Sequence, residues 1–585
     1  MKRICNVLLA LCMVLGMAAC SSNGTEQPQE PVEPKTATAT MQGFGGDVTV
    51  TLTVEGDKIT DVQMTGDKES ATLGGKAVQI LPERMMANNK VSVDKVTGAT
   101  ITSSVAIAAA KDALEQMGVT EDSLAKVEPE AINTDTVTAD VIVIGGGGAG
   151  IAAATTAGQA GKDVVLIEKL GILGGDTALS GGVRIRAKVD GDPEDTMTED
   201  QLYDFYMERT HYLSDPEVIR TYVDSVTESM AWADNLGNGI GETVRFRTNP
   251  ESIMALQPAN DGGRGLITTM TEGLEEAGVE VYLNSRAQEF IQDETGKVIG
   301  VKVLRENGEV QEFRSNGGVV LACGGFGNNA EMLKKYSTPG ADRVVNLCSI
   351  GGEGDGIVMG EKIGAAIRFA EDWDNNGTNS ELTPAYMVAF PTTDAVLVNN
   401  KGKRFITEDE QRPHIYKAMR LQLSDPEINK FWFIFDSTTV QDGADELVEK
   451  GSAIKADTLE ELADMMEIDK EAFFETIENY NNNKGKDDPE MGKPAKFMKG
   501  VNLEAGPFYA AKTWPLRTTT VGGIVINKDA EVLDNNDQPI PALYAAGAVA
   551  NYTFFNSNNP TCGSAVSNAV VFGRIAGANA AALAE

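Results

Sequence analysis

The sequence predicts a multidomain protein in which a small α+β domain precedes a larger α/β domain. Two patterns and the length support this. Residues 48–54 alternate apolar and polar side chains, turn at 55–57 and resume alternation at 59–62, which indicates a β-hairpin. Residues 140–144 form a continuous apolar run typical of a buried parallel strand. The 585 residues are enough for several domains.

The N-terminus has the features of an export signal. Lys2 and Arg3 precede an apolar run over residues 7–17, which is too short to span a bilayer permanently. The sequence that ends at Cys20 resembles a bacterial lipobox, which implies that Cys20 is lipidated; a plain secretory signal is the alternative. Residues 1–20 are therefore predicted as a lipoprotein signal peptide and 21–38 as a polar tether. The protein is expected outside the cytoplasm, anchored to the membrane by lipid.

Composition excludes several classes of partner. The formal net charge of −36 argues against binding to nucleic acid. Of the six cysteines, three lie in the predicted signal peptide and three are widely spaced (Cys323, Cys348 and Cys562). They provide neither a disulfide framework nor the spacing of a metal site, and no motif for attached c-type haem occurs. We therefore expect no metal.

Residues 39–118 contain the hairpin and two helical stretches, with Thr97-Gly98-Ala99-Thr100 before the second stretch. This block resembles the FMN-binding domain family. The resemblance implies that a flavin transferase attaches FMN covalently to Thr100 through a phosphoester bond. Gly98 and Ala99 would leave the backbone open to the phosphate, and Ser103 or Ser104 would cap a helix over 105–117. An ordinary helix start rich in Thr and Ser is the alternative interpretation.

Residues 119–137 are predicted as a linker, after which a nucleotide-binding motif follows. The strand at 140–144 is followed by Gly145, Gly147 and Gly150, an Ala-rich helix that includes Ala149, and a second strand ending at Glu168. Glycines at this spacing allow a tight turn and bring a pyrophosphate to the helix N-terminus. Glu168 is placed to accept hydrogen bonds from ribose hydroxyls. The motif predicts a Rossmann-type dinucleotide site.

The rest of the chain resembles the flavoproteins of the succinate dehydrogenase/fumarate reductase family. This resemblance implies non-covalent FAD, a FAD-binding domain over 138–370 and 518–585, and an inserted α+β cap domain over 371–517. It is carried by the glycine-rich segments at 174–182, 321–326, 354–356, 543–547 and 563–577. Ala548 departs from the Glu that many relatives have. The further cofactor residues implied are Lys169, Gly174, Gly175, Asp176, Thr177, Ser180, Gly181, Gly182, Ala287, Asp355, Gly547, Ala548, Ser564, Ala565 and Val566.

The same resemblance assigns the catalytic acid to Arg412, which would protonate one carbon while flavin delivers hydride to its neighbour. A guanidinium is a very weak acid. The role is reasonable only if hydride addition generates a strong base and if carboxylates reload the proton. Glu408, Asp409 and Asp394 are the candidates for that relay. The alternative is that Arg412 only pairs with these acids.

The His and Arg residues with which fumarate reductases bind two carboxylates are missing, and the chain has only two histidines. Fumarate is therefore disfavoured. A bulkier activated alkene, such as urocanate, an arylacrylate or an enone, is expected, and Arg517 remains available for one carboxylate. The substrate-binding candidates are Trp373, Asp374, Asn376, Tyr386, Thr519 and Gly563.

A second dinucleotide motif is not visible, so NADH is an improbable direct donor. Electrons are expected to pass from a membrane donor, either quinol-linked or part of an extracellular electron-transfer system, to FMN, then to FAD and the substrate. Three alternatives remain open: a ketosteroid-type dehydrogenase running in the oxidising direction, a fumarate reductase, and an electron carrier without its own substrate.

Overall fold

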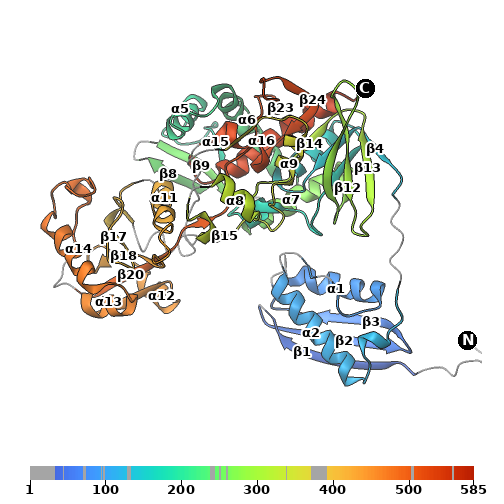
Figure 1. The fold of residues 1–585 in the computed structure, drawn as a ribbon, viewed down its shortest axis with the longest axis horizontal. Coiled ribbons are helices and arrows are strands. Elements are labelled where there is room, and N and C mark those ends of the chain that lie inside the picture. The colour runs from blue at the N-terminus through green and yellow to red at the C-terminus, as the bar shows by residue number, and fades with distance from the viewer. Residues whose placement is uncertain are drawn as a thin grey trace, which may run out of the picture. The chain divides into compact units, whose positions relative to one another are not determined.

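The computed structural model contains two compact units, residues Met1–Pro129 and Glu130–Glu585 (Figure 1). Cys20, the predicted signal peptide and most of the predicted tether lie outside the described residues. Within the described part, no helix is both long and apolar enough to cross a bilayer. The structure describes residues 33–43, 45–69, 74–93, 95–96, 99–127, 134–237, 244–249, 252–258, 261–337, 339–369, 392–410, 412–501, 506–556 and 559–584.

The first unit is an antiparallel sheet with helices packed against it, in agreement with the alternating sequence. The sheet order is β1-β2-β3, and Glu55 pairs with Lys58 across the predicted turn. Val48, Val50 and Leu52 of β2 are fully buried in a core that both long helices complete. The elements are β1 (Lys35–Gln42), β2 (Asp47–Glu55), β3 (Lys58–Thr65), α1 (Gly74–Asn88), α2 (Thr100–Gln116) and the 3-10 helix η1 (Glu121–Ser123).

A six-stranded sheet forms the centre of the second unit, in the order β10-β6-β5-β14-β24-β23. All neighbouring strands are parallel except β23, which pairs antiparallel with β24. β5 lies between β6 and β14, so β6 and β10 extend the sheet on one side of it and β14 and β24 on the other. A ligand crevice is expected where the strand order reverses in this way. The strands are β5 (Val141–Ile144), β6 (Val164–Ile167), β10 (Glu280–Tyr282), β14 (Val319–Leu321), β23 (Glu531–Leu533) and β24 (Pro539–Ala545).

Two long helices pack closely beside this sheet. A Cβ added at Gly573 of α16 would lie 2.4 Å from the Ala149 carbonyl oxygen of α3, and one at Gly577 would lie 2.2 Å from that of Ala153. The glycines therefore allow α16 to approach the backbone of α3 and hold the nucleotide-binding helix in place. The helices of this part are α3 (Gly148–Gln159), α4 (Gly175–Leu179), α5 (Glu199–Arg209), α6 (Pro216–Asp234), α7 (Gly262–Glu276), α8 (Ala330–Tyr336), α9 (Asp355–Lys362), α15 (Tyr552–Phe555), α16 (Ser564–Ala582), η2 (Ala341–Arg343) and η5 (Gly547–Val549).

Smaller sheets surround the central one, in the orders β11-β12-β13-β4, β7-β9-β8, β15-β21 and β16-β22. The first of these packs its buried side chains into the same core as the central sheet. Their strands are β4 (Val137–Ala139), β7 (Val183–Arg186), β8 (Val244–Asn249), β9 (Ser252–Pro258), β11 (Arg286–Gln292), β12 (Val298–Leu304), β13 (Val310–Ser315), β15 (Val345–Asn346), β16 (Ile367–Phe369), β21 (Leu516–Arg517) and β22 (Gly522–Ile524).

A separate antiparallel sheet, β17-β18-β20-β19, lies within the range predicted for the cap. Its central strand β18 is buried at every residue, and two distinct apolar clusters cover its two faces. The elements are β17 (Val396–Asn399), β18 (Phe431–Asp436), β19 (Ala453–Ala456), β20 (Phe508–Thr513), α11 (Arg412–Gln422), α12 (Ala444–Glu449), α13 (Leu459–Met466), α14 (Lys470–Asn482), η3 (Thr392–Asp394) and η4 (Ala495–Phe497).

A buried charge cluster connects the loop before α11 to the rest of this cap. Both oxygens of Glu408 contact the Arg404 guanidinium at 2.9 Å, and Lys493 Nζ lies 3.2 Å from Oε2. Arg404 also donates to Asp488 at 2.8 Å, and the Leu397 amide donates to Glu408 at 3.0 Å. Burial lowers the pKa of Lys493, while Glu408 opposes that effect. Two cations and two carboxylates thus compensate one another inside the cap.

Replacing Glu408 with alanine is expected to lower the free energy of unfolding by about 3–5 kcal/mol, because Arg404 and Lys493 would remain buried without this carboxylate. Urea unfolding of the variant and the wild type measures the change. The control is Glu446→Ala, which removes an exposed partner of Lys450 and should have little effect. Equal losses in the two variants would contradict the prediction.

Candidate flavin site

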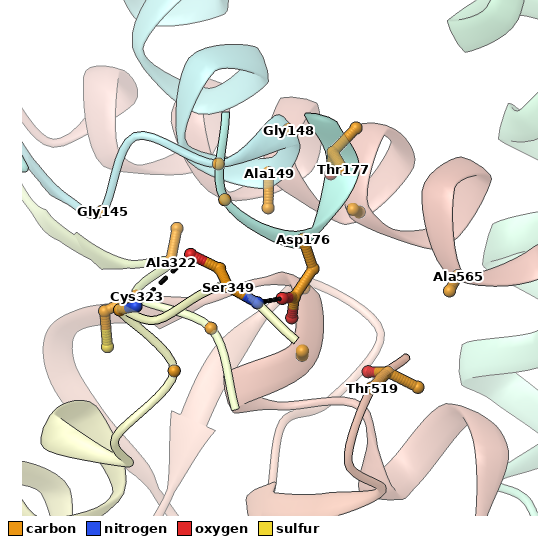
Figure 2. Close-up of a pocket in the computed structure, with 18 of the residues that line it drawn as sticks. Gly145, Gly148, Ala149, Asp176, Thr177, Ala322, Cys323, Ser349, Thr519 and Ala565 are labelled. Atoms are coloured by element: carbon orange, nitrogen blue, oxygen red, sulfur yellow. Dashed lines mark hydrogen bonds between the residues drawn. The ribbon is translucent and has the colours of Figure 1, made fainter. Parts of the chain in front are cut away.

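A cavity of about 340 Å³ lies at the carboxyl edge of the central sheet, where β5, β6 and β14 end beside the first turn of α3 (Figure 2). Residues from segments far apart in the sequence line it, including both ends of the predicted FAD-binding domain. The predicted cofactor residues that line the cavity are Gly145, Gly147, Ala149, Glu168, Lys169, Gly175, Asp176, Thr177, Ser180, Gly181, Ala287, Asp355, Gly547, Ala548, Ala565 and Val566.

The glycine-rich turn between β5 and α3 uses its glycines in different ways. Gly145 has φ +107°, and a Cβ there would lie 2.4 Å from the Ala322 carbonyl oxygen. A Cβ at Gly150 would lie only 1.8 Å from the carbonyl oxygen of Gly145, so Gly150 lies behind the turn instead of lining the cavity. At Gly147, in contrast, the nearest atom to an added Cβ is 3.9 Å away. The open side of the turn therefore faces the cavity.

The N-terminus of α3 is suited to a pyrophosphate. Its N-cap, Gly147, has no side chain to accept hydrogen bonds from the first backbone amides, and Gly147, Gly148 and Ala149 all line the cavity. Free amides and the positive end of the helix dipole attract anions. This bare helix end, open on its cavity side, fits the phosphates of FAD.

Glu168 directly follows β6 at the cavity wall and is 9% exposed. Its carboxylate accepts hydrogen bonds from the amides of Gly146 at 2.7 Å and Leu170 at 2.8 Å. Burial raises the pKa of Glu168, and these amide contacts act in the opposite direction. Each oxygen has a further lone pair for a ribose hydroxyl, which fits the predicted role.

The second glycine-rich segment forms the opposite wall. Asp176 and Thr177 line the cavity, while Gly174 and Gly182 support the segment from behind. The Gly174 amide donates to the Gly146 carbonyl at 2.8 Å, which joins the two glycine-rich segments. A Cβ at Gly182 would lie 2.4 Å from the backbone of Gly262, so this glycine allows close contact with α7.

Asp176 is the carboxylate that this segment contributes to the cavity. Its Oδ1 accepts a hydrogen bond from the Ser349 amide at 2.5 Å (Figure 2). Burial raises the pKa of Asp176 to about 6, although the Ser349 contact lowers it. The carboxyl group therefore changes its charge close to neutral pH, at the wall of the site.

Replacing Asp176 with asparagine is expected to stabilise the protein above pH 6 and to lose this effect at lower pH. The folded-state pKa of about 6 exceeds the ordinary value of 3.8, so the folded protein binds the proton more tightly. Binding of this proton stabilises the folded wild type, and that stabilisation is lost as the pH rises through about 6. Thermal unfolding between about pH 5 and pH 8 measures the difference, and a difference independent of pH would contradict the prediction.

Ser564 does not line the cavity, contrary to the expectation. Its hydroxyl lies 2.8 Å from the Tyr206 hydroxyl, which is 3.1 Å from that of Tyr222. Ser564 is fully buried in this interior network because the first turn of α16 directs Ala565 and Val566 to the cavity instead. Lys169 and Asp355 line the cavity and pair with each other at 2.9 Å.

Comparison with known proteins agrees with this geometry. Residues 140–566 match the FAD binding domain family, and residues 43–115 match the FMN-binding domain family. The chain is 34% identical to the urocanate reductase of Eggerthella lenta over 590 residues, which cover 94% of this chain and 92% of that protein. The chain belongs to the FAD-binding flavoprotein family that includes urocanate and fumarate reductases.

Two further relatives define the type of flavoprotein. This chain is 29% identical to the NADH:acrylate oxidoreductase of Vibrio harveyi. The match covers 93% of this chain but only 61% of that protein. The open conformation of a flavocytochrome c3 fumarate reductase superposes with a TM-score of 0.62 at 26% identity, covering 79% of this chain and 84% of that one. The protein is thus a flavin-dependent oxidoreductase with domains for both FAD and FMN.

The substrate candidates of this flavoprotein divide into two groups. Thr519 and Gly563 line the cavity, as does the neighbouring Thr518. Trp373, Asp374, Asn376 and Tyr386 lie outside the described residues. Arg517 does not line the cavity; it is 2% exposed, and its guanidinium donates to the Ala341 carbonyl at 2.5 Å.

The acids of the predicted proton relay have partners within the cap, and the side chain of Arg412 lies outside the described structure. Arg412 begins α11, and no described residue of 392–501 lines the cavity. Glu408 is fully buried in the charge cluster, where Arg404, Lys493 and the Leu397 amide take up its two oxygens. Asp394 pairs with Lys499 at 2.8 Å, and Asp409 accepts from the Thr407 hydroxyl. These contacts hold the three acids within the cap, and their part in a proton relay to Arg412 stays a prediction.

The predicted attachment motif lies at the start of α2. Thr100 is the first helical residue and Ala99 is the N-cap, whereas Gly98 lies outside the described residues. The expectation that Ser103 or Ser104 caps this helix is wrong, because the helix begins three residues before Ser103. The N-cap has no side-chain hydrogen bond, so the first amides of α2 remain open to an anion.

Sequence reasoning did not predict Ser349 and Asn551 in the cavity wall, and it included Cys323 and Gly324 only as part of the segment 321–326, without a role. Cys323 and Gly324 follow β14, and Ser349 and Asn551 come from loops. The position of Cys323 after a parallel strand was an available signal, because ligands bind at the carboxyl ends of such strands. Ser349 and Asn551 had no comparable signal. Among the described residues, no group of His, Cys, Asp or Glu side chains is arranged to hold a metal ion.

Proposed function

We propose that this protein is an extracytoplasmic reductase that adds a hydride and a proton across an activated carbon–carbon double bond. The observation that carries the proposal is the likeness to a urocanate reductase over nearly the whole chain, with the FMN and FAD domains present together. FAD in the cavity supplies the hydride. Arg412 would supply the proton to the adjacent carbon, and the nearby carboxylates, Asp409 among them, would return a proton to it.

The cavity wall supports a substrate other than a dicarboxylate. Among its described residues the only cation is Lys169, whose ammonium already contacts Glu353 at 3.0 Å and Asp355 at 2.9 Å. Two carboxylates would need charged partners that these residues do not offer. Urocanate, arylacrylates and enones, which carry at most one carboxylate, are therefore the proposed substrates.

The substrate test is oxidation of a reduced dye by the purified protein in the presence of urocanate, cinnamate, acrylate, fumarate and an enone. Turnover with urocanate or an arylacrylate, well above that with fumarate, is the expected result. The reverse assay uses an oxidised dye with saturated ketones. If a ketone donates electrons while no alkene accepts them, the enzyme is a dehydrogenase and the proposal fails.

We also propose that electrons enter through FMN joined to Thr100 by a phosphoester bond, which a flavin transferase forms. A membrane donor, either quinol-linked or part of an extracellular electron-transfer system, would reduce it. A covalent link is useful outside the cytoplasm, where a free flavin would diffuse away. The lipid on Cys20 would keep the protein at the membrane.

Thr100→Ala is expected to abolish the covalent flavin and to stop turnover with the membrane donor. Mass spectrometry of exported wild type and variant measures the adduct, and Thr36→Ala, an exposed threonine of the same domain, is the control. FAD content should be unchanged in both variants. A covalent flavin that persists in Thr100→Ala would contradict the assignment. In the same preparation, Cys20→Ser should release the protein from the membrane fraction.

A further inference from the structure

We infer that Glu69 directs flavin attachment to Thr100 by holding the neighbouring Thr102 hydroxyl in the domain interior. This rests on the proposed function, because it concerns which hydroxyl of the motif receives FMN. Thr100, Thr102, Ser103 and Ser104 all offer hydroxyl groups within the first turns of α2. Burial or hydrogen bonding of the other hydroxyl groups would therefore favour selective modification of Thr100.

Glu69 lies beyond the end of β3 and reaches α2 across the domain. Glu69 is 8% exposed, and its Oε2 accepts a hydrogen bond from the Thr102 hydroxyl at 2.7 Å. Its Oε1 accepts from the Gly45 amide at 2.9 Å. Thr102 is only 3% exposed. A hydrogen bond to a charged acceptor is stronger than one between neutral groups, so this contact holds Thr102 firmly.

Glycines make the space for this carboxylate. A Cβ added at Gly43 would lie 2.4 Å from Oε1 of Glu69, and one at Gly74 would lie 2.3 Å from Oε2. At Gly66 an added Cβ would lie 3.2 Å from Cγ of the same side chain. A side chain at Gly43 or Gly74 would displace the carboxylate from Thr102. Three glycines from different positions in the sequence thus surround the Glu69 side chain.

The Ser103 hydroxyl of the motif is also occupied. Ser103 is fully buried, and its Oγ accepts a hydrogen bond from the Val96 amide at 3.0 Å. Ser104, one residue further on, is half-buried. Thr100 differs because it begins α2, where the N-cap Ala99 places no side chain over the first amides. The free amides and the positive end of the helix dipole at this helix start favour a phosphate there.

The attachment step balances without a redox reagent. The hydroxyl oxygen of Thr100 forms a bond to the FMN phosphorus of a flavin dinucleotide, and the bond from that phosphorus to the bridging oxygen breaks. Adenosine monophosphate leaves, and the hydroxyl proton passes to the transferase or to water. Glu69 takes no part in these bonds. It is a positioning residue, whose effect is on the choice of hydroxyl.

The test expresses the full chain with a flavin transferase and maps the flavin by peptide mass spectrometry. In Glu69→Ala the Thr102 hydroxyl loses its charged acceptor, and the fraction of flavin on Thr102 should rise about tenfold or more over wild type. Glu69→Gln keeps one accepting oxygen and should give a smaller rise. The matched control is Glu121→Ala, which removes a carboxylate that also binds one amide and one hydroxyl, both of Ser92, elsewhere in the domain.

The outcomes separate this inference from the proposed function. If wild type carries no flavin on Thr100, the proposed attachment fails before Glu69 is considered. If wild type is modified on Thr100 and both Glu69 variants give Thr100 alone, as Glu121→Ala should, the inference is wrong. Loss of all modification in a folded Glu69→Gln would also overturn it. If Glu69→Ala does not accumulate, the result with Glu69→Gln decides.

Discussion

Replacing Arg412 with alanine is expected to lower kcat by about 10²- to 10⁴-fold, the usual contribution of a positioned general acid. FAD should remain bound, because the substitution leaves the glycine-rich turn, the N-terminus of α3 and Glu168 in the cavity wall unchanged. The loss should therefore appear in turnover of the alkene and leave the flavin absorbance spectrum unchanged. Steady-state kinetics with a reduced dye and the best alkene of the panel measure it.

The control for this experiment is Lys417→Ala, which removes another cation from α11 and should leave kcat close to wild type. A protein that only carries electrons would keep its dye activity in both variants. An Arg412→Ala enzyme with normal alkene turnover would show that the proton comes from another group. Reduction of FAD in that variant by the electron donor should proceed at the normal rate, since this step needs no proton from Arg412.

The second large effect concerns the nucleotide-binding turn. Gly147→Ala is expected to fold normally but to lose FAD, because the added methyl group has nothing nearer than 3.9 Å within the protein. The φ of Gly147 is −79°, which alanine adopts without strain. The methyl group would therefore stand in the space where the backbone must approach the pyrophosphate. FAD content after purification, together with the unfolding temperature, separates binding from stability.

Gly150→Ala is the contrasting variant in the same turn. Its methyl group would lie 1.8 Å from the Gly145 carbonyl oxygen, so the turn itself must move. This variant should lose both FAD and stability. If Gly147→Ala kept its FAD, or if it were destabilised as strongly as Gly150→Ala, the division of roles between the two glycines would be incorrect.

Much of the fold could be predicted from local patterns. The apolar run of β5, the glycine-rich turn and the acid at the end of β6 occur within one segment, and their spacing is fixed by direct contact with a nucleotide. The alternation in β2 likewise follows from one buried face. Such signals are readable because the residues that interact are close together in the sequence.

The parts that could not be predicted depend on contacts between distant segments. Glu408 looked like a relay acid near Arg412, but its environment is set by Lys493, which lies far along the chain. Ser564 stands in the same motif as Ala565, yet a one-residue step on a helix turns its hydroxyl toward Tyr206. Periodicity does not reveal such partners. The start of α2 was predicted too late for a related reason. Serine is a common N-cap, but Ser103 lies within the first turn of α2, where its hydroxyl accepts a hydrogen bond from the Val96 amide.

The self-contained apolar core of the first unit has a consequence for the evolution of this enzyme. Its buried side chains, from Ala39 to Leu124, form a cluster of their own, distinct from the cores of the second unit. Such a domain can be exchanged as a module without disturbing the packing around FAD. Lineages could therefore replace the FMN-binding domain while they keep the FAD-binding domain and its cavity unchanged.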